Sequence, residues 1–288
     1  MAPMGESLRE LWRYRELLRQ LVARDLKVRY QNSAVGFLWS IVPPLLQALV
    51  YSFLIKSVLN VKAENYGAYV LCGLIPWTFF SVSILDAAHS LVHNEAIVKK
   101  VYMPREVIPL SSVAGNFAHF LLGWTVYFFV YYVAFRLIGH GGIPVLATAL
   151  WFPLITLMML LLTMGISLWI SILGLFYKDT KFIVQTLFNL LFFLAPVLYP
   201  ADSLYYKPVM QAHPWLFKLY LLNPVASLIN AYRKTLLEDI PAGTLNVKGP
   251  SLPMDWPLFA ASCLLCVVIA ASGYAYFNRH KWEIVERM

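Results

Sequence analysis

The sequence predicts an all-α integral membrane protein with six transmembrane helices, and three observations support this fold class. First, 60% of the 288 residues are hydrophobic and only 13% are charged, whereas a soluble domain carries about 25% charged residues. Second, long uncharged stretches recur along the chain, and about 20 apolar residues are enough to cross a bilayer. Third, Lys and Arg concentrate in alternate connecting segments. Lipid rather than water is therefore the expected solvent.

The predicted domain organisation follows from these uncharged stretches. Residues 1–33 form a charged N-terminal segment, residues 34–277 a transmembrane domain, and residues 278–288 a polar tail. The spans are expected at residues 34–56, 66–90, 107–136, 145–176, 182–200 and 256–277. Because six crossings are an even number, both termini are expected on the same side of the membrane.

The distribution of basic residues predicts which side that is. The N-terminal segment is rich in Arg, and the connections on its side of the membrane contain further basic residues: Lys99, Lys100, Arg105, Lys178, Lys181, Arg279, Lys281 and Arg287. The short opposite loops carry only Lys56, Lys62 and Arg136. The positive-inside rule then places both termini in the cytoplasm. This rule and the attraction of anionic lipid headgroups explain the net charge of +8, so membrane lipid is an expected partner and nucleic acid is not.

The N-terminal segment is expected to form an amphipathic helix in the cytoplasmic interface. Ser7 and Glu10 have the spacing of a capping box. Apolar residues then recur with a helical period, at Leu8, Leu11, Trp12, Leu18, Leu21 and Val22. Such a helix lies in the plane of the interface. A simple membrane anchor and one wall of a substrate entrance are both compatible with this pattern.

Residues 94–105, between the second and third spans, predict a second short cytoplasmic helix. Asn94 can cap it, Glu95 suits its first turn, and Met103 followed by Pro104 ends it. The segment is too short and too charged to insert into the bilayer. A short amphipathic helix in a cytoplasmic turn is what a membrane subunit would offer to a soluble motor.

Residues 207–237 lie before the last span and contain two apolar pieces, at 208–217 and 219–232. Both are shorter than the roughly 20 residues that a transmembrane helix needs. Asn223 and Pro224 fit an N-cap followed by proline at the first helical position. The pieces predict two re-entrant helices that form an outer gate. An amphipathic cover on the outer leaflet is the alternative.

The spans contain few groups that could carry chemistry. Asp86 is their only acidic residue, and His119 is the one candidate for a proton relay, although a packing role explains it as well. The sequence has no Walker A motif G-x-x-x-x-G-K-[ST]. Cys263 and Cys266 have C-x-x-C spacing but lie in an apolar run, where cysteine behaves as a small hydrophobe. We expect no catalytic residue, no metal site and no cofactor in this chain.

Aromatic and polar stripes suggest a path through the membrane. One face of the third span is aromatic, and aromatic rings can stack on sugar rings; lipid-facing or interhelical packing explains the same stripe. Polar residues in spans act as interhelical glue or line a wet cavity. The candidate lining residues are Ser40, Gln47, Tyr51, Trp124, Tyr127, Tyr131, Phe135, Gln185 and Asn189.

Several short runs, in this order, resemble the permease subunits of ABC-2 type exporters, in the branch that exports polysaccharides such as O-antigen, capsule and teichoic acid. These runs are RDLKVRY at 24–30, GFLW at 36–39, GLIPW at 73–77, KKVYMPR at 99–105, YKD at 177–179, and LNP at 222–224 ahead of Tyr232 and Arg233. The resemblance covers nearly the whole chain.

The resemblance implies a homodimer in the bacterial cytoplasmic membrane, with a separate ATP-binding cassette subunit, which binds ATP and Mg, under each copy. The substrate would be a lipid-linked glycan on an undecaprenyl carrier. The residues that would dock the ATPase are Glu95, Lys99, Lys100, Arg105 and Asp179. The outer gate would contain Pro196, Trp215, Asn223, Pro224 and Tyr232. A membrane glycosyl- or acyltransferase is the alternative, and a secondary transporter is the third; both need ionisable groups gathered at one membrane depth.

Overall fold

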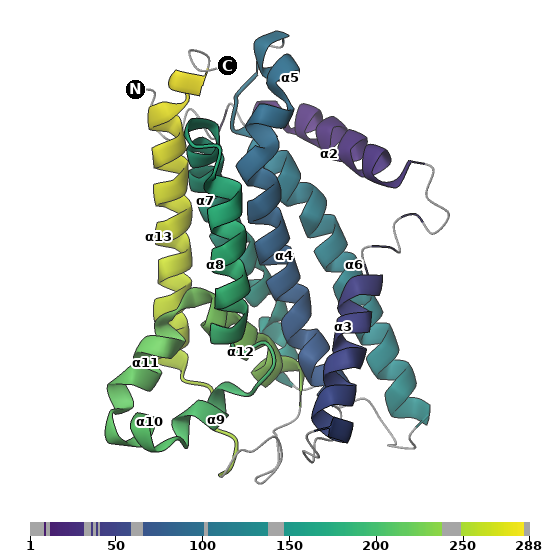
Figure 1. Cartoon of the computed structure of the whole chain (residues 1–288), viewed down its shortest axis with the longest axis vertical. Coiled ribbons are helices and arrows are strands. Elements are labelled where there is room, and N and C mark those ends of the chain that lie inside the picture. The colour runs from purple at the N-terminus through teal and green to yellow at the C-terminus, as the bar shows by residue number, and fades with distance from the viewer. Residues whose placement is uncertain are drawn as a thin grey trace.

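A computed structural model describes residues 9, 12–31, 36, 39, 41–58, 66–100, 103–137, 147–237 and 249–284. Within these ranges the side chains of residues 131, 132, 134–137 and 147 are not described. All the regular elements of the described part are helices (Figure 1). The predicted all-α fold class is therefore confirmed.

The centre of the bundle is α4 (Tyr66–His93), which packs against α6 (Val107–Leu137) and α7 (Phe152–Phe176) (Figure 1). The last long helix, α13 (Trp256–His280), packs mainly on α7. The two helices differ in how far their most apolar 18-residue stretches are buried. In α4, 72% of these residues are buried, whereas in α13 only 28% are buried. A helix that is hydrophobic on all sides belongs in such a central position.

Small residues allow the long helices to approach closely. A Cβ on Gly273 of α13 would lie 2.1 Å from the carbonyl oxygen of Gly165 on α7. A Cβ on Gly174 would lie 2.0 Å from the carbonyl oxygen of Ala88 on α4. Close contacts between small residues are a main source of helix association in lipid, where apolar surface alone gives little preference for protein over lipid.

Four helices in the described part of the chain are long and apolar enough to cross a membrane: Tyr66–His93, Val107–Val130, Thr148–Phe176 and Trp256–His280. The first and fifth predicted spans correspond to shorter helices. The first consists of α3 (Val42–Phe53) and the π-helical η2 (Leu54–Val58), and the fifth is α8 (Thr180–Leu194). The predicted count of six spans is thus not confirmed by helix length. The fourth span begins with a 3-10 turn, η3 (Ala147–Trp151), ahead of α7.

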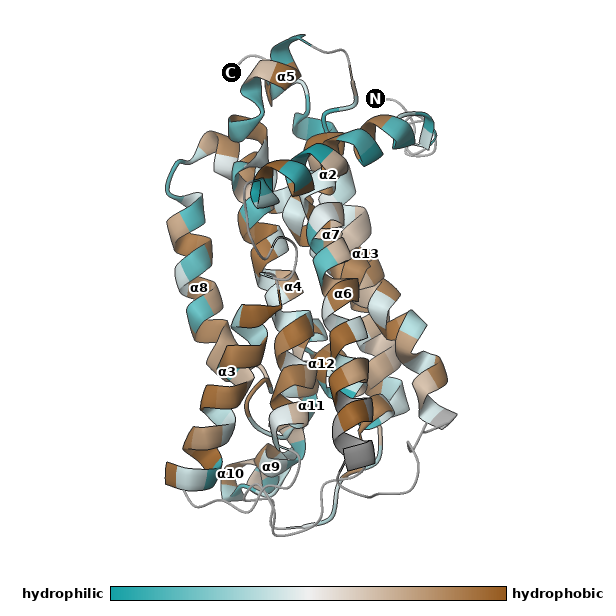
Figure 2. Ribbon diagram, turned by 90° about the vertical axis from the view of Figure 1, so that its right-hand side faces the viewer, coloured by the Kyte–Doolittle hydropathy of each residue, from teal (hydrophilic) through white to brown (hydrophobic). Residues whose placement is uncertain are grey.

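The two ends of the bundle differ in composition and structure. Helix α2 (Arg15–Tyr30) lies across one end of the bundle, where α5 (Glu95–Lys100) also lies (Figure 1). Hydrophilic residues concentrate on α2 and α5, while α3 is mostly hydrophobic (Figure 2). The predicted capping residues Ser7 and Glu10 lie outside the described residues.

The opposite end contains α9 (Ala201–Tyr205), α10 (Pro208–Ala212), α11 (Pro214–Leu222) and α12 (Pro224–Leu236). The expected division into two pieces, at 208–217 and 219–232, is wrong. Three of these helices begin at a proline, and the chain breaks at His213 and Asn223. The Asn223 side chain accepts a hydrogen bond from the Val225 amide at 3.1 Å, which confirms the predicted N-cap.

Candidate functional site

The predicted docking residues lie at the α2 end of the bundle. Glu95 and Lys99 form an ion pair within α5, and the side chain of Lys100 is exposed. Asp179 is exposed in the turn ahead of α8 and makes no side-chain cap there. The apolar side of α5, Ile97 and Val98, packs on the cluster around Leu91 and Ile108. Helix α5 thus presents its charged side outward and its apolar side to the bundle.

Arg105 is placed differently from the other docking candidates. Its guanidinium donates to the carbonyl of Lys281 and lies 5.6 Å from the ring centroid of Trp282. The side chain is half-buried. Arg105 therefore connects the loop after α5 to the C-terminal tail, an intramolecular contact that sequence reasoning missed.

The polar lining candidates of α3 and α8 lie on the surface of the single chain. Gln47, Gln185 and Asn189 are exposed, and Tyr51 is half-buried with its ring centroid 6.3 Å from that of Phe192. Around Gln185 and Asn189, α8 exposes large apolar side chains: Phe182, Ile183, Leu187, Leu190, Phe193 and Leu194. The structure therefore places Gln185 and Asn189 on one apolar outer surface, whereas Gln47 also lines a cavity between α3, α4 and α6. Ser40 lies outside the described residues.

Two residues of the aromatic stripe of α6 lie in the core of the fold. Trp124 and Tyr127 are each 2% exposed, inside the core cluster. The ring centroid of Trp124 lies 4.9 Å from that of Tyr232 and 5.1 Å from that of Phe152. This position favours the packing alternative for Trp124 and Tyr127 over a lining role between two copies. The side chains of Tyr131 and Phe135 lie outside the described residues.

One gate candidate, Pro196, contacts Arg233 on α12, a residue that the family resemblance included but that was not predicted as a gate residue. Its guanidinium donates to the carbonyls of Tyr69 at 3.3 Å and Tyr199 at 3.1 Å, and to those of Pro196 and Val197. It also donates to the Tyr69 hydroxyl at 2.8 Å and lies 3.7 Å from the centroid of that ring.

Arg233 is only 4% exposed, and it contacts carbonyls, a hydroxyl and an aromatic ring. No carboxylate in the described part of the chain pairs with it. A Cβ on Gly73 would lie 2.5 Å from Nη2 of Arg233. The glycine of the GLIPW run therefore leaves room for the guanidinium. An arginine in a short apolar helix was the signal available in the sequence, because an ionisable residue at membrane depth usually has a specific partner.

The remaining gate candidates differ in burial. Tyr232 is fully buried and its hydroxyl donates to Thr156 Oγ1 at 3.0 Å, whereas Trp215 is 60% exposed. Next to Arg233, Lys234 Nζ lies 2.6 Å from Asp202 Oδ2 and also donates to Ser251 Oγ. These contacts hold α12 against α9 and against the segment that leads into α13.

A polar cluster connects α2 to the long helices. Arg29 donates to Asp86 Oδ2 at 2.9 Å and to Asn116 Oδ1 at 3.0 Å, and the Asn116 amide donates to Asp86 Oδ2 at 2.8 Å. Beside them, Tyr30 Oη lies 3.3 Å from His119 Nε2. The lone acidic residue of the spans is thus neutralised from α2, which sequence reasoning did not foresee.

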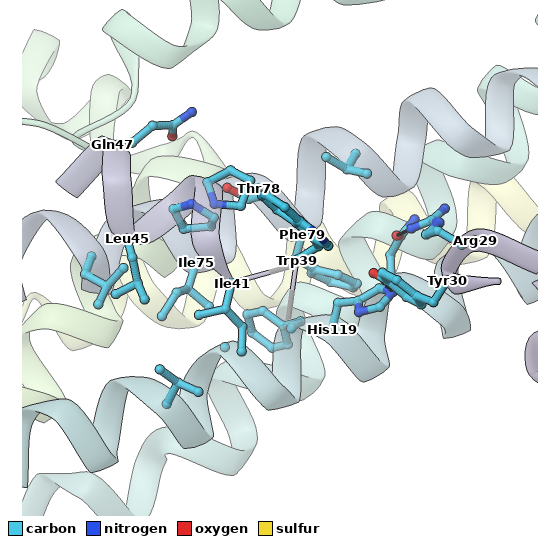
Figure 3. A pocket seen from close by; sticks show the side chains of 18 residues that line it. Arg29, Tyr30, Trp39, Ile41, Leu45, Gln47, Ile75, Thr78, Phe79 and His119 are labelled. Atoms are coloured by element: carbon cyan, nitrogen blue, oxygen red, sulfur yellow. Dashed lines mark hydrogen bonds between the residues drawn. The ribbon is translucent and has the colours of Figure 1, made fainter. Parts of the chain in front are cut away.

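Two cavities adjoin this cluster. One, of about 390 Å³, lies between the end of α2, α3, α4 and α6 and is lined mostly by apolar side chains (Figure 3). The other, of about 1000 Å³, lies under α2 and is lined by more polar groups, including Arg24, Asp25, His89 and Lys181. Arg29 lines both.

Among the residues that the structure describes, no group of three or more His, Cys, Asp or Glu side chains could hold a metal ion. Cys72, Cys263 and Cys266 are free thiols in or near the core. The clustered charges described above instead connect helices to one another. The geometry fits a membrane subunit with one charged end and an exposed apolar side.

Comparison with known proteins identifies a family with this architecture. The family model for ABC-2 type transporters matches residues 16–237. This range includes α2 except its first residue, all of α5, and the Arg233 site. The chain is 34% identical to the O-antigen export system permease protein RfbA of Klebsiella pneumoniae over 94% of each chain. It is 29% identical to the protein of the same name from Myxococcus xanthus, over 96% of this chain and 98% of that one. It is 21% identical to the polysialic acid transport protein KpsM of Escherichia coli, over 75% and 80%. Because the family model matches more than two thirds of the chain and the structure is a bundle of apolar helices, the chain belongs to the ABC-2 type transporter family.

Proposed function

We propose that this chain is the membrane-spanning permease subunit of an ATP-driven exporter that moves a lipid-linked polysaccharide across the bacterial cytoplasmic membrane. The observation that carries the proposal is the similarity to O-antigen export permeases, which extends over 94% of both chains. The relationship therefore includes the charged end, the bundle and the short helices of the far end together. The carrier of the glycan would be undecaprenyl phosphate or diphosphate.

The active form would be a homodimer, with the glycan passing between the two copies. The exposed amides of Gln185 and Asn189 lie on the apolar outer surface of α8. Polar groups in spans usually face a bundle interior or a wet cavity, because lipid cannot hydrogen-bond to them. A second copy packed near α3 and α8 would give these amides such an environment.

A separate ATP-binding cassette subunit would dock at α5 and supply the ATP and Mg site. The charged side of α5, with Lys100 exposed and Glu95 paired to Lys99, faces away from the bundle at the end where α2 lies (Figure 1). This end would be cytoplasmic, in agreement with the positive-inside rule. The chain itself would have no enzymatic activity.

The proposal is tested by reconstituting the chain with an ATP-binding cassette subunit from the same organism in vesicles that contain a defined undecaprenyl-linked glycan. We expect ATP-dependent transfer of the glycan across the bilayer, and none with either subunit alone. Transfer of sugar or acyl groups by the purified chain would instead support the transferase alternative. Transport driven by an ion gradient without the ATPase would support a secondary transporter.

A further inference from the structure

The polar cavity under α2 has more positive than negative groups. Arg24 is paired with Asp25 at 2.6 Å, and Arg29 with Asp86 at 2.9 Å. Lys181, at the start of α8, lines the same cavity and is half-buried. Within the described ranges it has neither a hydrogen bond nor an ion pair. A half-buried ammonium without a counter-ion favours an anionic ligand.

The neighbouring cavity is lined by polar side chains at one end and mostly by apolar side chains along the rest of its length. Arg29, Tyr30 and His119 gather at one end, and apolar side chains such as Ile41, Ile75 and Leu45 line the space away from them (Figure 3). Both cavities fall in the range of roughly 300–1,000 Å³ that ligand pockets occupy. Because Arg29 lines both, an anionic head and an apolar tail could be bound side by side.

The depth of the cavities in the bundle identifies the class of ligand. The polar cavity lies under α2, the hydrophilic helix across the charged end (Figure 2). An interfacial helix of this kind lies at the level of lipid headgroups. The apolar cavity lies toward α3, deeper in the bundle, at the level of acyl chains. Head and tail would therefore have the orientation of a phospholipid in the adjoining leaflet.

We propose that these two cavities hold one anionic phospholipid per chain. Its phosphate would lie near Lys181 and Arg29, and one acyl chain would fill the space between α3, α4 and α6. The site is built from one copy of the chain, so the lipid is a resident ligand that holds α2 on the bundle. It differs from the glycan path, which we place between two copies, although residues of α3 and α8 contribute to both.

Two variants test the head and the tail separately. Lys181→Gln removes the surplus cation, and Lys178→Gln is its matched control, because Lys178 is exposed in the same turn and lines neither cavity. Gly123→Leu puts a side chain into the apolar cavity. A Cβ on Gly123 would lie 3.4 Å from the nearest atom of Ile75, an ordinary contact, and the rest of the leucine side chain would occupy the cavity.

The measurement is binding of labelled phosphatidylglycerol to the delipidated full chain, with native mass spectrometry to count bound lipids. We expect one phosphatidylglycerol per chain and a clear preference over phosphatidylcholine. Lys181→Gln should weaken binding about tenfold, the effect of losing one charge-assisted hydrogen bond. Gly123→Leu should weaken it at least as much, and Lys178→Gln should leave it unchanged.

Competition experiments, in which other molecules displace the labelled phosphatidylglycerol, identify which kind of molecule supplies the bound phosphate. If inorganic phosphate displaces the label, or if phosphatidylcholine binds equally well, the phospholipid proposal is overturned. Displacement by a polyprenyl phosphate at lower concentration would assign the site to the carrier lipid and also overturn it. A Gly123→Leu chain that gains thermal stability and keeps its lipid would show that the apolar cavity is empty. Since the two variants act on different ends of the site, either one decides the outcome if the other fails to fold.

Discussion

Arg29 at the α2 end and Arg233 at the far end both have their charges compensated inside the chain, but the compensating groups and the burial of the two side chains differ. Arg29 has a carboxylate partner in Asp86, and the two side chains are 44% and 35% exposed. Arg233 is 4% exposed and is held by backbone carbonyls and Tyr69. An exposed ion pair contributes little and is screened by salt, whereas a buried charge depends fully on its partners. The charged end should therefore tolerate substitution and the far end should not.

The largest effect is expected from Arg233→Met. The substitution leaves several buried carbonyls without a donor and should lower the free energy of unfolding by about 3–5 kcal/mol. Unfolding of purified protein in mixed micelles measures this. Arg29→Met is the matched control and should cost about 1 kcal/mol or less. If the two variants lose equal free energy of unfolding, the proposed difference between the two ends is wrong.

Gly73→Ala should have the next largest effect. Its new Cβ would lie 2.5 Å from Arg233 Nη2 and 3.1 Å from the Val197 carbonyl oxygen, an overpacking that costs about 1–3 kcal/mol. The cost should shrink in an Arg233→Met background, because the main clash is with the guanidinium. Gly115→Ala is the control: its Cβ would meet nothing within 4 Å. Additive losses from Gly73→Ala and Arg233→Met would show that the two residues are not coupled.

Asp86→Asn tests how much the ion pair with Arg29 contributes to stability at the charged end. It removes the carboxylate from Arg29 but keeps a side-chain oxygen that can accept from Asn116. We expect a loss of about 0.2–1 kcal/mol that decreases as salt concentration rises. A double-mutant cycle of Asp86 and Arg29, measured at low and high salt, gives the coupling energy. A loss above 3 kcal/mol that salt leaves unchanged would mean that this pair behaves like a buried one.

The smallest effect on stability is expected from Lys100→Glu on α5. Its side chain is exposed, so the free energy of unfolding should change by no more than about 0.5 kcal/mol. If α5 docks the ATPase as proposed, the variant should nevertheless lose its partner on copurification. Lys56→Glu, an exposed charge reversal on η2, should keep the partner. Retention of the ATPase by Lys100→Glu would remove this lysine from the docking surface.

The sequence by itself determined the elements that depend on local signals. An absence of charge located the long helices, and a charged amphipathic pattern located α2. Proline after a capping residue fixed the start of α12 at Asn223, since the cap needs only neighbouring backbone groups. The lengths of α3 and α8 were overestimated, because an uncharged stretch does not show where its helix ends.

Only the tertiary structure decided which faces of these helices point inward. Helix α6 is apolar on all sides, so its pattern could not show that Trp124 and Tyr127 pack in the core rather than line a path. The carbonyl partners of Arg233 belong to residues 69, 196, 197 and 199, far away in the chain. Every residue has a carbonyl, so no side-chain pattern marks such a site. The bundle had to bring these groups together before the charge could be compensated.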